Sequence, residues 1–434
     1  MVAKLLNKNI VRELWKRNCT KFTIVLWASS VSEMKGYLYC ILTSGRLFEL
    51  PYGEEKFTLS FARWLVKQNL EVIIIGSTFA GIKAKYLSKD EETENRKDNQ
   101  KKIRAANLPY VIYMLSRLYL SLLYFFKILS INRKTPIRII HAQDTGYSGL
   151  PAVIAGKILK IPVVLSSHII RHRGLEPKLT GRIGKILLKF EYSIDIFTVR
   201  KADRIIAINP DIKNYYEKLV GKKIEFIPNT IKMKNFVFSS SDRSLIRKEL
   251  GLDEPIKLIG CVARLSPEKN LITLINAVAK AIQDNPLIRL VIVGIGTQES
   301  QLRDEVRKHH LEDKVIFCVG VNNDIPRILS GLDIFVLPSY HEGISGALLE
   351  AMSCERAIIC SNIPGNQVLV THNKEGLLFN PHDSQELSDA IKLLSTDDSL
   401  RSRLGSNAKI KASEYDEDIV FPKILQFYST LAKK

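Results

Sequence analysis

Short apolar runs alternate with amphipathic stretches along almost the whole chain, and this alternation restricts the fold more than any other feature. Runs of this length between helical patterns are typical of βαβ units, in which helices cover both faces of a parallel sheet. We therefore expect an α/β protein with two doubly wound domains facing a central cleft, and ligands beyond the carboxyl ends of the strands. The runs are FTIVLWA (22–28), EVIIIGS (71–77), IRIIHA (137–142), PVVLSSH (162–168), RIIAINP (204–210), KLIGCVA (257–263), RLVIVG (289–294), KVIFCVG (314–320), DIFVLPS (333–339), AIICSN (357–362) and GLLFN (376–380).

A polar, turn-rich segment, FIPNTIKMKNFVFSSSD (226–242), joins the two sets of runs. The sequence thus predicts an N-terminal domain over residues 1–235 and a C-terminal domain over residues 236–413. Residues 414–434 are expected to form a closing helix that crosses back to the first domain. Two further expected helices and one charged insertion, expected as a mobile loop, are KFTLSFARWLVKQN (56–69), LPAVIAGKILK (150–160) and, for the insertion, KYLSKDEETENRKDNQKK (85–102).

The chain of 434 residues has a net charge of +19, and the excess lies in its first half. Residues 1–230 hold 39 Lys and Arg against 19 Asp and Glu, whereas residues 231–434 hold 25 against 26. This asymmetry indicates two domains with different partners, the first partner being anionic, although charge kept for solubility gives the same count.

The cysteines are scattered without a CxxC pair, at Cys19, Cys40, Cys261, Cys318, Cys354 and Cys360. This spacing favours reduced thiols over a disulfide framework or a zinc site. The N-terminus lacks the apolar core and cleavage site of a secretory signal. The longest apolar stretch, residues 108–130, is interrupted by Arg117 and Lys127. We therefore expect a cytoplasmic protein.

Two acids flank a stretch of small residues in PSYHEGISGALLEAM (338–352). Glu342 precedes the expected start of a helix at Ser345, and Glu350 lies inside that helix. The N–H groups around Ser345 would lie at the positive end of the helix, which suits a phosphate. Because carboxylates repel phosphate, the acids should contact hydroxyl groups instead, and a nucleotide sugar fits this order. Each acid alone is more simply an ordinary surface residue.

A second candidate segment is GCVARLSPEKN (260–270), which directly follows an expected strand. It places Arg264 and Lys269 around a Ser-Pro turn. A planar guanidinium and a point-like ammonium at the carboxyl end of a strand suit a diphosphate leaving group. Ordinary surface charge is the alternative for both residues.

Taken in order, these segments resemble the retaining glycosyltransferases of family 4, which have the GT-B fold of two Rossmann-like domains. The first matching segment is similar to the glycine loop of the family, with Gly53 and Glu55 at the matching places, and the second ends in the active-site histidine, His168. The Glu, seven residues, Glu pattern, with the Arg–Lys loop about 75 residues upstream, is highly specific in this context. The matching segments are YGEEKFTLSFARWLVKQNLEVIII (52–75), PVVLSSH (162–168), KADRIIAIN (201–209), IPNTI (227–231), VARLSPEKN (262–270) and PSYHEGISGALLEAM (338–352).

The chain departs from the family pattern at several small-residue positions. None of these departures removes a charged catalytic position, but they leave the fine geometry and the choice of donor open. The departures are Tyr52, Thr230 and Asn270, each where the family usually has glycine, Ile344-Ser345 for Phe-Gly, and Glu355 for a small residue.

The resemblance implies that Glu342 binds the hydroxyls of the donor hexose, that Glu350 binds the ribose, and that Arg264 and Lys269 bind the diphosphate. His168 should lie across the cleft near the transferred sugar, so the implied catalytic set is His168, Glu342, Arg264 and Lys269. The implied mechanism is a same-face substitution with retention, in which the leaving phosphate helps to deprotonate the acceptor hydroxyl. No nucleophile of the enzyme, no metal and no other cofactor is then expected. The rest of the implied donor site is Gly343, Ile344, Ser345 and Gly346.

The resemblance implies transfer of a hexose to a hydroxyl of a glycan or lipid-linked glycan, and UDP-hexose is favoured over GDP-mannose as donor. The base is expected to contact backbone atoms near CVGVNND (318–324). The basic residues beside residues 108–130 predict peripheral binding to an anionic membrane surface on its cytoplasmic face. A buried position for that helix is the alternative.

Two other functional classes agree with parts of the sequence. A basic nucleic-acid-binding protein would explain the positive first half, but not the Arg–Lys loop or the paired acids, so no nucleic-acid partner is expected. A nucleotide-sugar epimerase or a sugar phosphorylase of the same fold stays open, although the pyridoxal-phosphate lysine site usual in a phosphorylase is not identified.

Overall fold

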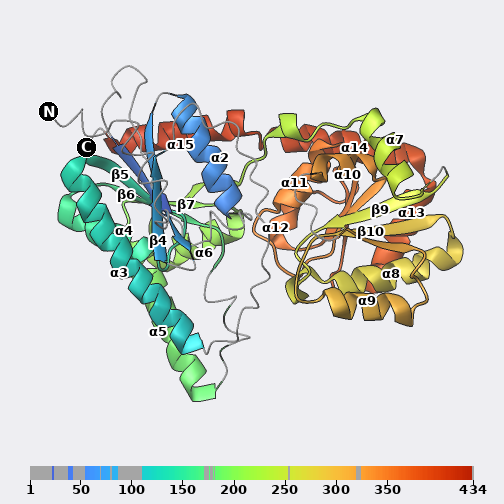
Figure 1. Cartoon of the computed structure of the whole chain (residues 1–434), viewed down its shortest axis with the longest axis horizontal. Helices are drawn as coiled ribbons and strands as arrows, with labels where there is room; N and C mark the ends of the chain where they lie inside the picture. The colour runs from blue at the N-terminus through green and yellow to red at the C-terminus, as the bar shows by residue number, and fades with distance from the viewer. Residues whose placement is uncertain are drawn as a thin grey trace. The chain divides into compact units, whose positions relative to one another are not determined.

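The chain folds into two compact α/β units (Figure 1), of which unit 1 comprises residues 1–227 and 421–434 and unit 2 comprises residues 228–420. The expectation of two Rossmann-like α/β domains is confirmed. The structure is a computed structural model. It describes residues 22–23, 38–42, 54–68, 70–78, 81–86, 110–170, 175, 179, 181–252, 255–318 and 324–432.

The sheet of unit 1 has the order β1-β4-β3-β2-β5-β6-β7-β8 in the described residues. All neighbouring strands are parallel except β3 and β4. The strands are β1 (Phe22–Thr23), β2 (Leu38–Leu42), β3 (Glu71–Thr78), β4 (Gly81–Tyr86), β5 (Ile137–Ala142), β6 (Val163–Ser167), β7 (Arg204–Ala207) and β8 (Glu225–Phe226).

Strand β4 corrects two sequence expectations. Its pairing with β3 is antiparallel, Thr78 opposite Gly81, because two intervening residues are too few for a crossover to a parallel strand. Its last two residues, 85–86, also belong to the segment expected as a charged loop, while residues 87–102 lie outside the described part of the chain.

The helices of unit 1 form two groups. Helix α2 packs against α15 through Phe57, Phe61 and Phe421, whose rings lie 5.0–6.1 Å apart. Helix α4 contacts both α3 and α5 and covers β5 and β6. The helices are α2 (Glu54–Lys67), α3 (Tyr110–Lys134), α4 (Gly149–Leu159), α5 (Gly181–Lys201), α6 (Pro210–Val220) and α15 (Glu417–Ala432), the last of which enters unit 1 at Phe421.

Helix α3 contains most of residues 108–130, for which both a buried and a membrane-facing position were open. Tyr124 and Ile128 are buried against the unit, whereas Leu122 and Phe126 are exposed. The helix is therefore neither wholly buried nor wholly exposed. No helix among the described residues combines the length and the apolar character that crossing a membrane requires.

The sheet of unit 2 is parallel throughout and has the order β11-β10-β9-β12-β13-β14. Counted from β9, this order is 3-2-1-4-5-6, the strand order of a Rossmann domain. The strands are β9 (Lys257–Val262), β10 (Ile288–Val293), β11 (Val315–Cys318), β12 (Ile334–Leu337), β13 (Ala357–Ser361) and β14 (Leu377–Phe379).

Alternate strand residues of unit 2 supply two apolar cores, one on each face of the sheet. Leu290 and Ile292 of β10 join the core under α8, α9 and α13, while Val291 and Val293 join the core under α7, α10, α11 and α14 (Figure 1). The helices are α7 (Ser240–Glu249), α8 (Leu271–Asp284), α9 (Glu299–Lys308), α10 (Ile325–Gly331), α11 (Gly346–Ser353), α12 (Pro364–Gln367), α13 (Ser384–Thr396) and α14 (Asp398–Ser413), with short 3-10 turns η3 (Met233–Asn235) and η4 (Pro267–Lys269).

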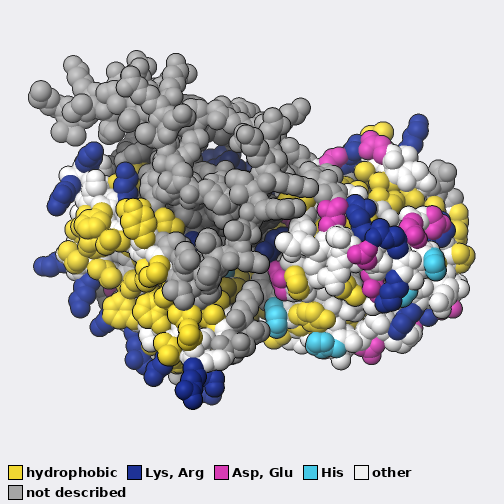
Figure 2. All heavy atoms as spheres, turned by 60° about the horizontal axis from the view of Figure 1, so that its bottom comes forward, with side chains coloured by type: hydrophobic (Ala, Val, Ile, Leu, Met, Phe, Trp, Pro, Cys, Tyr) yellow, Lys and Arg dark blue, Asp and Glu magenta, His cyan; other side chains and the backbone are white. Residues whose placement is uncertain are grey.

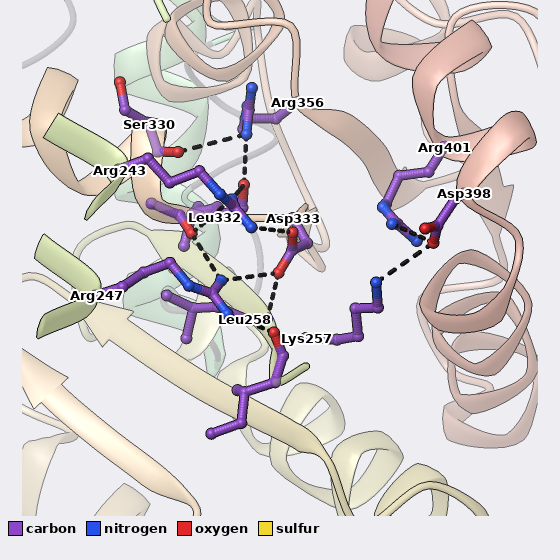
Figure 3. A network of polar contacts seen from close by, with 12 residues as sticks. Arg243, Arg247, Lys257, Leu258, Ser330, Leu332, Asp333, Arg356, Asp398 and Arg401 are labelled. Carbon is purple, nitrogen blue, oxygen red and sulfur yellow. Dashed lines mark hydrogen bonds and ion pairs between the residues drawn. The ribbon is translucent and has the colours of Figure 1, made fainter. Parts of the chain in front are cut away.

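An ionic network joins α7 to the amino ends of β9 and β12 (Figure 3). Asp333 accepts from Arg243 at 2.8 Å, from Arg247 at 3.1 Å and from the backbone N–H of Leu258 at 2.7 Å. The side chains of Asp333 and Arg247 are 8% and 5% exposed, so these charges depend on each other for solvation. The network holds the edge of the sheet opposite to the one where ligands bind in Rossmann domains.

Candidate active site

The strand order of unit 2 reverses between β9 and β12, and the candidate donor residues follow these two strands. The chain leaves β9 towards β10 and returns on the other side to β12. The loops after β9 and β12 therefore begin side by side at the carboxyl edge of the sheet. Loops that separate at such a switch point form the ligand crevice of open α/β sheets.

The loop after β9 holds Arg264 and Lys269 in different ways. The guanidinium of Arg264 is 57% exposed and bonds the carboxylate of Glu268 at 3.1 Å. Burial would raise the pKa of Glu268, but its hydrogen bond from Ser266 and the nearby cations lower it overall. Arg264 thus stays at the surface of the loop, where a ligand anion can reach it.

Asn270 ends this loop in the left-handed conformation, with φ 55°. Asparagine tolerates this region better than most residues, which explains how it can stand where the family has glycine. Its side-chain amide also donates to the carbonyls of Pro338 and Pro381, at 3.0 and 2.8 Å. The loop after β9 is thereby fixed to the loops after β12 and β14.

Lys269 and Glu342, which are 73 residues apart in the sequence, form a direct ion pair at 2.6 Å. Their side chains are only 16% and 10% exposed. Ser339 donates to the same oxygen of Glu342 at 2.7 Å. The backbone N–H of Tyr340 also bonds the carbonyl of Glu268, so the two loops are joined at two points.

Helix α11 begins at the predicted position. Ser345 is its N-cap, with its side chain accepting from the backbone N–H of Leu348. The N–H groups of Gly346 and Ala347 lie in the first turn, where a helix offers them no internal acceptor. A Cβ on Gly346 would meet no heavy atom within 4 Å, so there is open space at the positive end of the helix.

The other predicted donor residues of this segment lie in succession around the helix start. Ile344 is 5% exposed and belongs to the apolar core, and Gly343 is half-buried. Glu350 lies one turn below Gly346 on α11 and is 7% exposed. The structure thus brings Glu342 and Lys269 into contact and places Glu350 beside the same helix start.

Three glycines that were not singled out in the sequence make the loop packing possible. A Cβ on Gly294 would lie 1.9 Å from the carbonyl oxygen of Ala263, and one on Gly296 would lie 2.2 Å from that of Leu265. A Cβ on Gly365 would lie 2.3 Å from the carbonyl oxygen of Glu342. For Gly294 and Gly296, the GxG spacing after β10 was the available sequence signal.

His168 of unit 1 follows β6 and belongs to a neutral polar cluster. Its Nε2 lies 3.1 Å from the amide oxygen of Gln143. Because an amide oxygen only accepts, Nε2 carries the proton of the neutral ring. Nδ1 is then a hydrogen-bond acceptor, and it is buried without a partner among the described residues.

Behind His168 lies a second histidine, His141, which is 2% exposed. Its Nε2 is 2.7 Å from the hydroxyl of Ser166, and its Nδ1 bonds the hydroxyl of Tyr428 on α15. Burial lowers the pKa of His168 to about 4, while the charge of Asp144 acts in the opposite direction. Burial and the neighbouring His168 lower the pKa of His141 to about 3. Both rings are therefore neutral at pH 7.

The remaining predicted positions are only partly described. Gly53 lies outside the described residues, as do residues 319–323 of the segment expected near the base. Glu55 lies in the first turn of α2, but its side chain is not among those described. No group of three or more potential metal ligands occurs in the described part of the chain.

The carboxyl edge of the unit 2 sheet thus combines two cations, the start of a helix and two carboxylates. The cations and the helix N–H groups suit phosphate oxygens. Glu342, fixed by Lys269 and Ser339, keeps a second oxygen that can accept from hydroxyl groups.

Comparison with known protein families gives two adjoining matches. Residues 52–234 match the model described as Glycosyltransferase Family 4, and residues 242–411 match the model described as Glycosyl transferases group 1. The two matches divide near the junction of the two units.

Two relatives illustrate the similarity in sequence. The chain is 31% identical over 297 residues to the UDP-Gal:alpha-D-GlcNAc-diphosphoundecaprenol alpha-1,3-galactosyltransferase of Escherichia coli, a match that covers 67% of this chain and 74% of that protein. It is 36% identical over 123 residues, 28% of this chain and 33% of the relative, to the N,N'-diacetylbacillosaminyl-diphospho-undecaprenol alpha-1,3-N-acetylgalactosaminyltransferase of Campylobacter jejuni.

Among solved structures, the fold is similar to that of Anabaena Alr3699/HepE in complex with UDP, with a TM-score of 0.68, 20% identity and coverage of 90% of this chain and 99% of that one. At that identity the likeness concerns the fold alone. The family matches and the Escherichia coli relative establish the family and the enzyme class that the motifs predicted. The chain belongs to the family 4 glycosyltransferases of the GT-B fold.

Proposed function

We propose that this glycosyltransferase is a retaining enzyme that transfers a hexose from UDP-hexose to a hydroxyl of a lipid-linked or other membrane-displayed glycan. It works without an enzyme nucleophile or a metal ion, as a peripheral protein at the cytoplasmic face of a membrane. The observation that carries this proposal is the contact between Lys269 and Glu342 at the switch point of the unit 2 sheet, beside the start of α11.

The diphosphate, hexose and ribose of the donor bind to successive groups along that edge. The diphosphate lies against Arg264, Lys269 and the first-turn N–H groups of α11, because these are the positive groups of the site. Glu342 accepts from hydroxyls of the hexose. Glu350 accepts from the ribose, one helical turn below the phosphate-binding N–H groups.

The reaction breaks the bond between C1 of the hexose and the β-phosphate oxygen, and forms a bond from C1 to the acceptor oxygen on the same face. The proton of the acceptor hydroxyl passes to the departing phosphate oxygen. Arg264 and Lys269 stabilise the charge that develops on the UDP leaving group, which is the principal electrostatic demand of the step. Because these two cations supply positive charge, the proposed step needs no metal ion.

His168 acts in this scheme as a neutral hydrogen-bonding group for the sugar. Its pKa of about 4 keeps it uncharged at neutral pH, and Gln143 occupies its Nε2. An unpaired buried acceptor costs about 1–3 kcal/mol, so a sugar hydroxyl that reaches Nδ1 would remove this cost on binding.

The choice of UDP and of a lipid-linked acceptor rests on the relatives. The name of the Escherichia coli relative specifies a UDP-sugar donor, and the names of both relatives specify acceptors linked to undecaprenol diphosphate. The surplus of basic residues in the first half of the chain is compatible with such an anionic, membrane-held acceptor.

Thermal shift against UDP, GDP and ADP tests the donor site directly. A ligand that binds the folded protein raises the melting temperature by mass action, and we expect the largest rise with UDP. Equal rises with all three, or none, would contradict the proposed donor.

The stereochemistry and metal independence need a turnover assay with UDP-hexose and a diphosphoundecaprenol-linked sugar. Proton NMR of the product should show the α-anomer from an α-linked donor, and the initial rate should survive EDTA. A β-anomer, or loss of activity that magnesium restores, would overturn the corresponding part of the proposal.

A further inference from the structure

The solvent side of α3 carries an apolar stripe. Leu115, Tyr119, Leu122 and Phe126 recur at intervals of four and three residues and are 52–61% exposed. This spacing places them on one face, opposite to the buried Tyr124. The stripe therefore takes no part in the core of unit 1.

Helices α4 and α5 continue this apolar surface. On α5 the exposed positions again follow a helical spacing, and two of them are about 70% exposed. Since α4 contacts both α3 and α5, the exposed apolar residues belong to neighbouring helices. They are Ile154 and Ile158 on α4 and Ile183, Ile186, Phe190 and Phe197 on α5. We call the solvent side of these three helices the α3–α5 face. Figure 2 shows a broad hydrophobic area on this part of the molecule, bordered by Lys and Arg.

The charges of the α3–α5 face have one sign. The three helices contain ten Lys and Arg, four in α3, one in α4 and five in α5, and only two acids. Both acids, Glu191 and Asp195, are buried, at 1% and 0% exposure. Glu191 accepts from the hydroxyl of Tyr147, and Asp195 from that of Tyr216. These helices therefore present no carboxylate to the solvent.

We propose that the α3–α5 face docks on the surface of an anionic lipid bilayer. Large apolar patches on soluble proteins usually mark an interaction site. A helix surface that combines apolar stripes with flanking Lys and Arg can place its side chains at the acyl boundary and its cations among lipid phosphates. Phe126 and Phe190 would enter the interface, with Lys185 and Lys189 at headgroup level.

The charge also distinguishes a bilayer from a second copy of the chain. A symmetric dimer through this face would oppose two sets of cations without a carboxylate to pair with them. Like charges across an interface disfavour association. The inference deepens the proposed function, since it identifies the surface that would bring the enzyme to a membrane-held acceptor.

Vesicle flotation tests the proposal without donor or acceptor, so its outcome is independent of the proposed reaction. We expect the full chain to bind phosphatidylglycerol-containing vesicles and to bind pure phosphatidylcholine vesicles far more weakly. Raising the salt concentration from 50 mM to 500 mM should weaken the binding, because the screening length falls. Equal binding to both vesicle types would overturn the proposal.

Two double variants test the face itself. Lys185→Gln with Lys189→Gln should weaken vesicle binding roughly 30-fold, since each basic residue near such a surface contributes about fivefold. Ile183→Ser with Ile186→Ser should weaken it about tenfold or more by removing apolar area from the interface.

Matched controls are Leu245→Ser with Ile410→Ser, two exposed apolar residues of unit 2, which should bind as the unaltered chain does. Light scattering after gel filtration gives the oligomeric state of each variant, and UDP thermal shift shows that it is folded. The proposal fails if both face variants bind vesicles normally. It also fails if the unaltered chain is a dimer that the face variants dissociate, because the face would then be a self-association surface.

Discussion

The two units have related sheets but different chemistry at the edge where the carboxyl ends of their strands lie. In unit 2 the loops after β9 and β12 bring together the ions Lys269 and Glu342. In unit 1 the corresponding groups are neutral: burial lowers the pKa of His141, near the end of β5, to about 3 and that of His168, directly after β6, to about 4. The same scaffold thus supports an ionic edge in one unit and an uncharged hydrogen-bonding edge in the other.

The distribution of charge over each unit runs the other way. The half of the chain without excess charge, residues 231–434, contains the ionic edge, while the strongly basic half contains the neutral one. Ten of the Lys and Arg residues of unit 1 lie on the outer helices α3, α4 and α5. Net charge therefore said little about the chemistry of either edge.

The largest effect should come from the ionic network at the other end of the unit 2 sheet. Asp333→Ala leaves the nearly buried Arg247 without its partner, so we expect a loss of about 3–5 kcal/mol in the free energy of unfolding. Urea unfolding of unit 2, followed by far-UV circular dichroism, measures it. Folded Asp333→Ala protein should still bind UDP with unaltered affinity.

Asp398→Ala is the control for that prediction, because this acid belongs to the same region of Figure 3 and is 73% exposed. Exposed ion pairs contribute about 0–1 kcal/mol, so its loss should be correspondingly small. Similar losses for the two variants would contradict the expectation that the nearly buried pair contributes more than the exposed one.

The second prediction is a change in UDP affinity that leaves the stability of the fold almost unaltered. Arg264→Ala should weaken UDP binding about tenfold to hundredfold, as expected for the loss of a charge-assisted hydrogen bond to phosphate. Stability should change little, because Arg264 is 57% exposed and pairs only with Glu268 among the described residues. Isothermal titration with UDP measures the affinity.

Arg307→Ala provides the matched control, since Arg307 is similarly exposed and pairs with an acid on its own helix, Asp304. UDP should bind this variant as tightly as the unaltered protein. If both arginine variants bind UDP normally, Arg264 does not bind the diphosphate.

Most of the fold was predictable because buried strands and amphipathic helices have distinct periodicities. The apolar run over residues 137–142 coincides with β5, and residues 71–77 fall within β3. The missed strand β4, GIKAKY, carries two lysines and pairs at an antiparallel edge, so it lacks the continuous apolar character of its neighbours.

The site was less completely predictable. The sequence identified Lys269 and Glu342 as candidate site residues in two separate segments. Their contact depends on β9 and β12 being neighbours in the sheet. The role of Asp333 was not predictable, because an acid before a strand is ordinary in sequence and its two arginines come from a helix about 90 residues earlier. The exposed stripe of α5 could not be told from a core-facing stripe without knowing its neighbours.

The third prediction concerns the pH dependence of stability that the two buried histidines of unit 1 cause. The unfolded chain protonates His141 and His168 near pH 6.5, whereas the folded protein does so near pH 3 and pH 4. Between these limits the unfolded state binds more protons, so stability falls as the pH falls. The slope is at most about 1.4 kcal/mol per pH unit for each ring.

Urea midpoints at pH 7.5, 6.0 and 5.0 measure this dependence. His168→Asn should make it shallower. His310→Asn, at an exposed left-handed position that asparagine tolerates, should leave it unchanged. An unchanged or steeper dependence in His168→Asn would contradict a depressed pKa at this position.

The smallest effect on folding is expected for Gly346→Ala, because Gly346 borders open space at the ionic edge. Gly346→Ala puts a methyl group where no atom lies within 4 Å, at the first position of α11, so the free energy of unfolding should stay the same or rise by up to about 1 kcal/mol. UDP binding should nevertheless weaken severalfold, because the methyl group occupies the approach of a phosphate to the helix N–H groups. Gly365→Ala should instead lower the free energy of unfolding. Its Cβ would lie 2.3 Å from the carbonyl oxygen of Glu342, so the loop must distort. If Gly346→Ala binds UDP as well as the unaltered protein does, the start of α11 is a structural helix end and the ionic edge holds its anion through Arg264 and Lys269 alone.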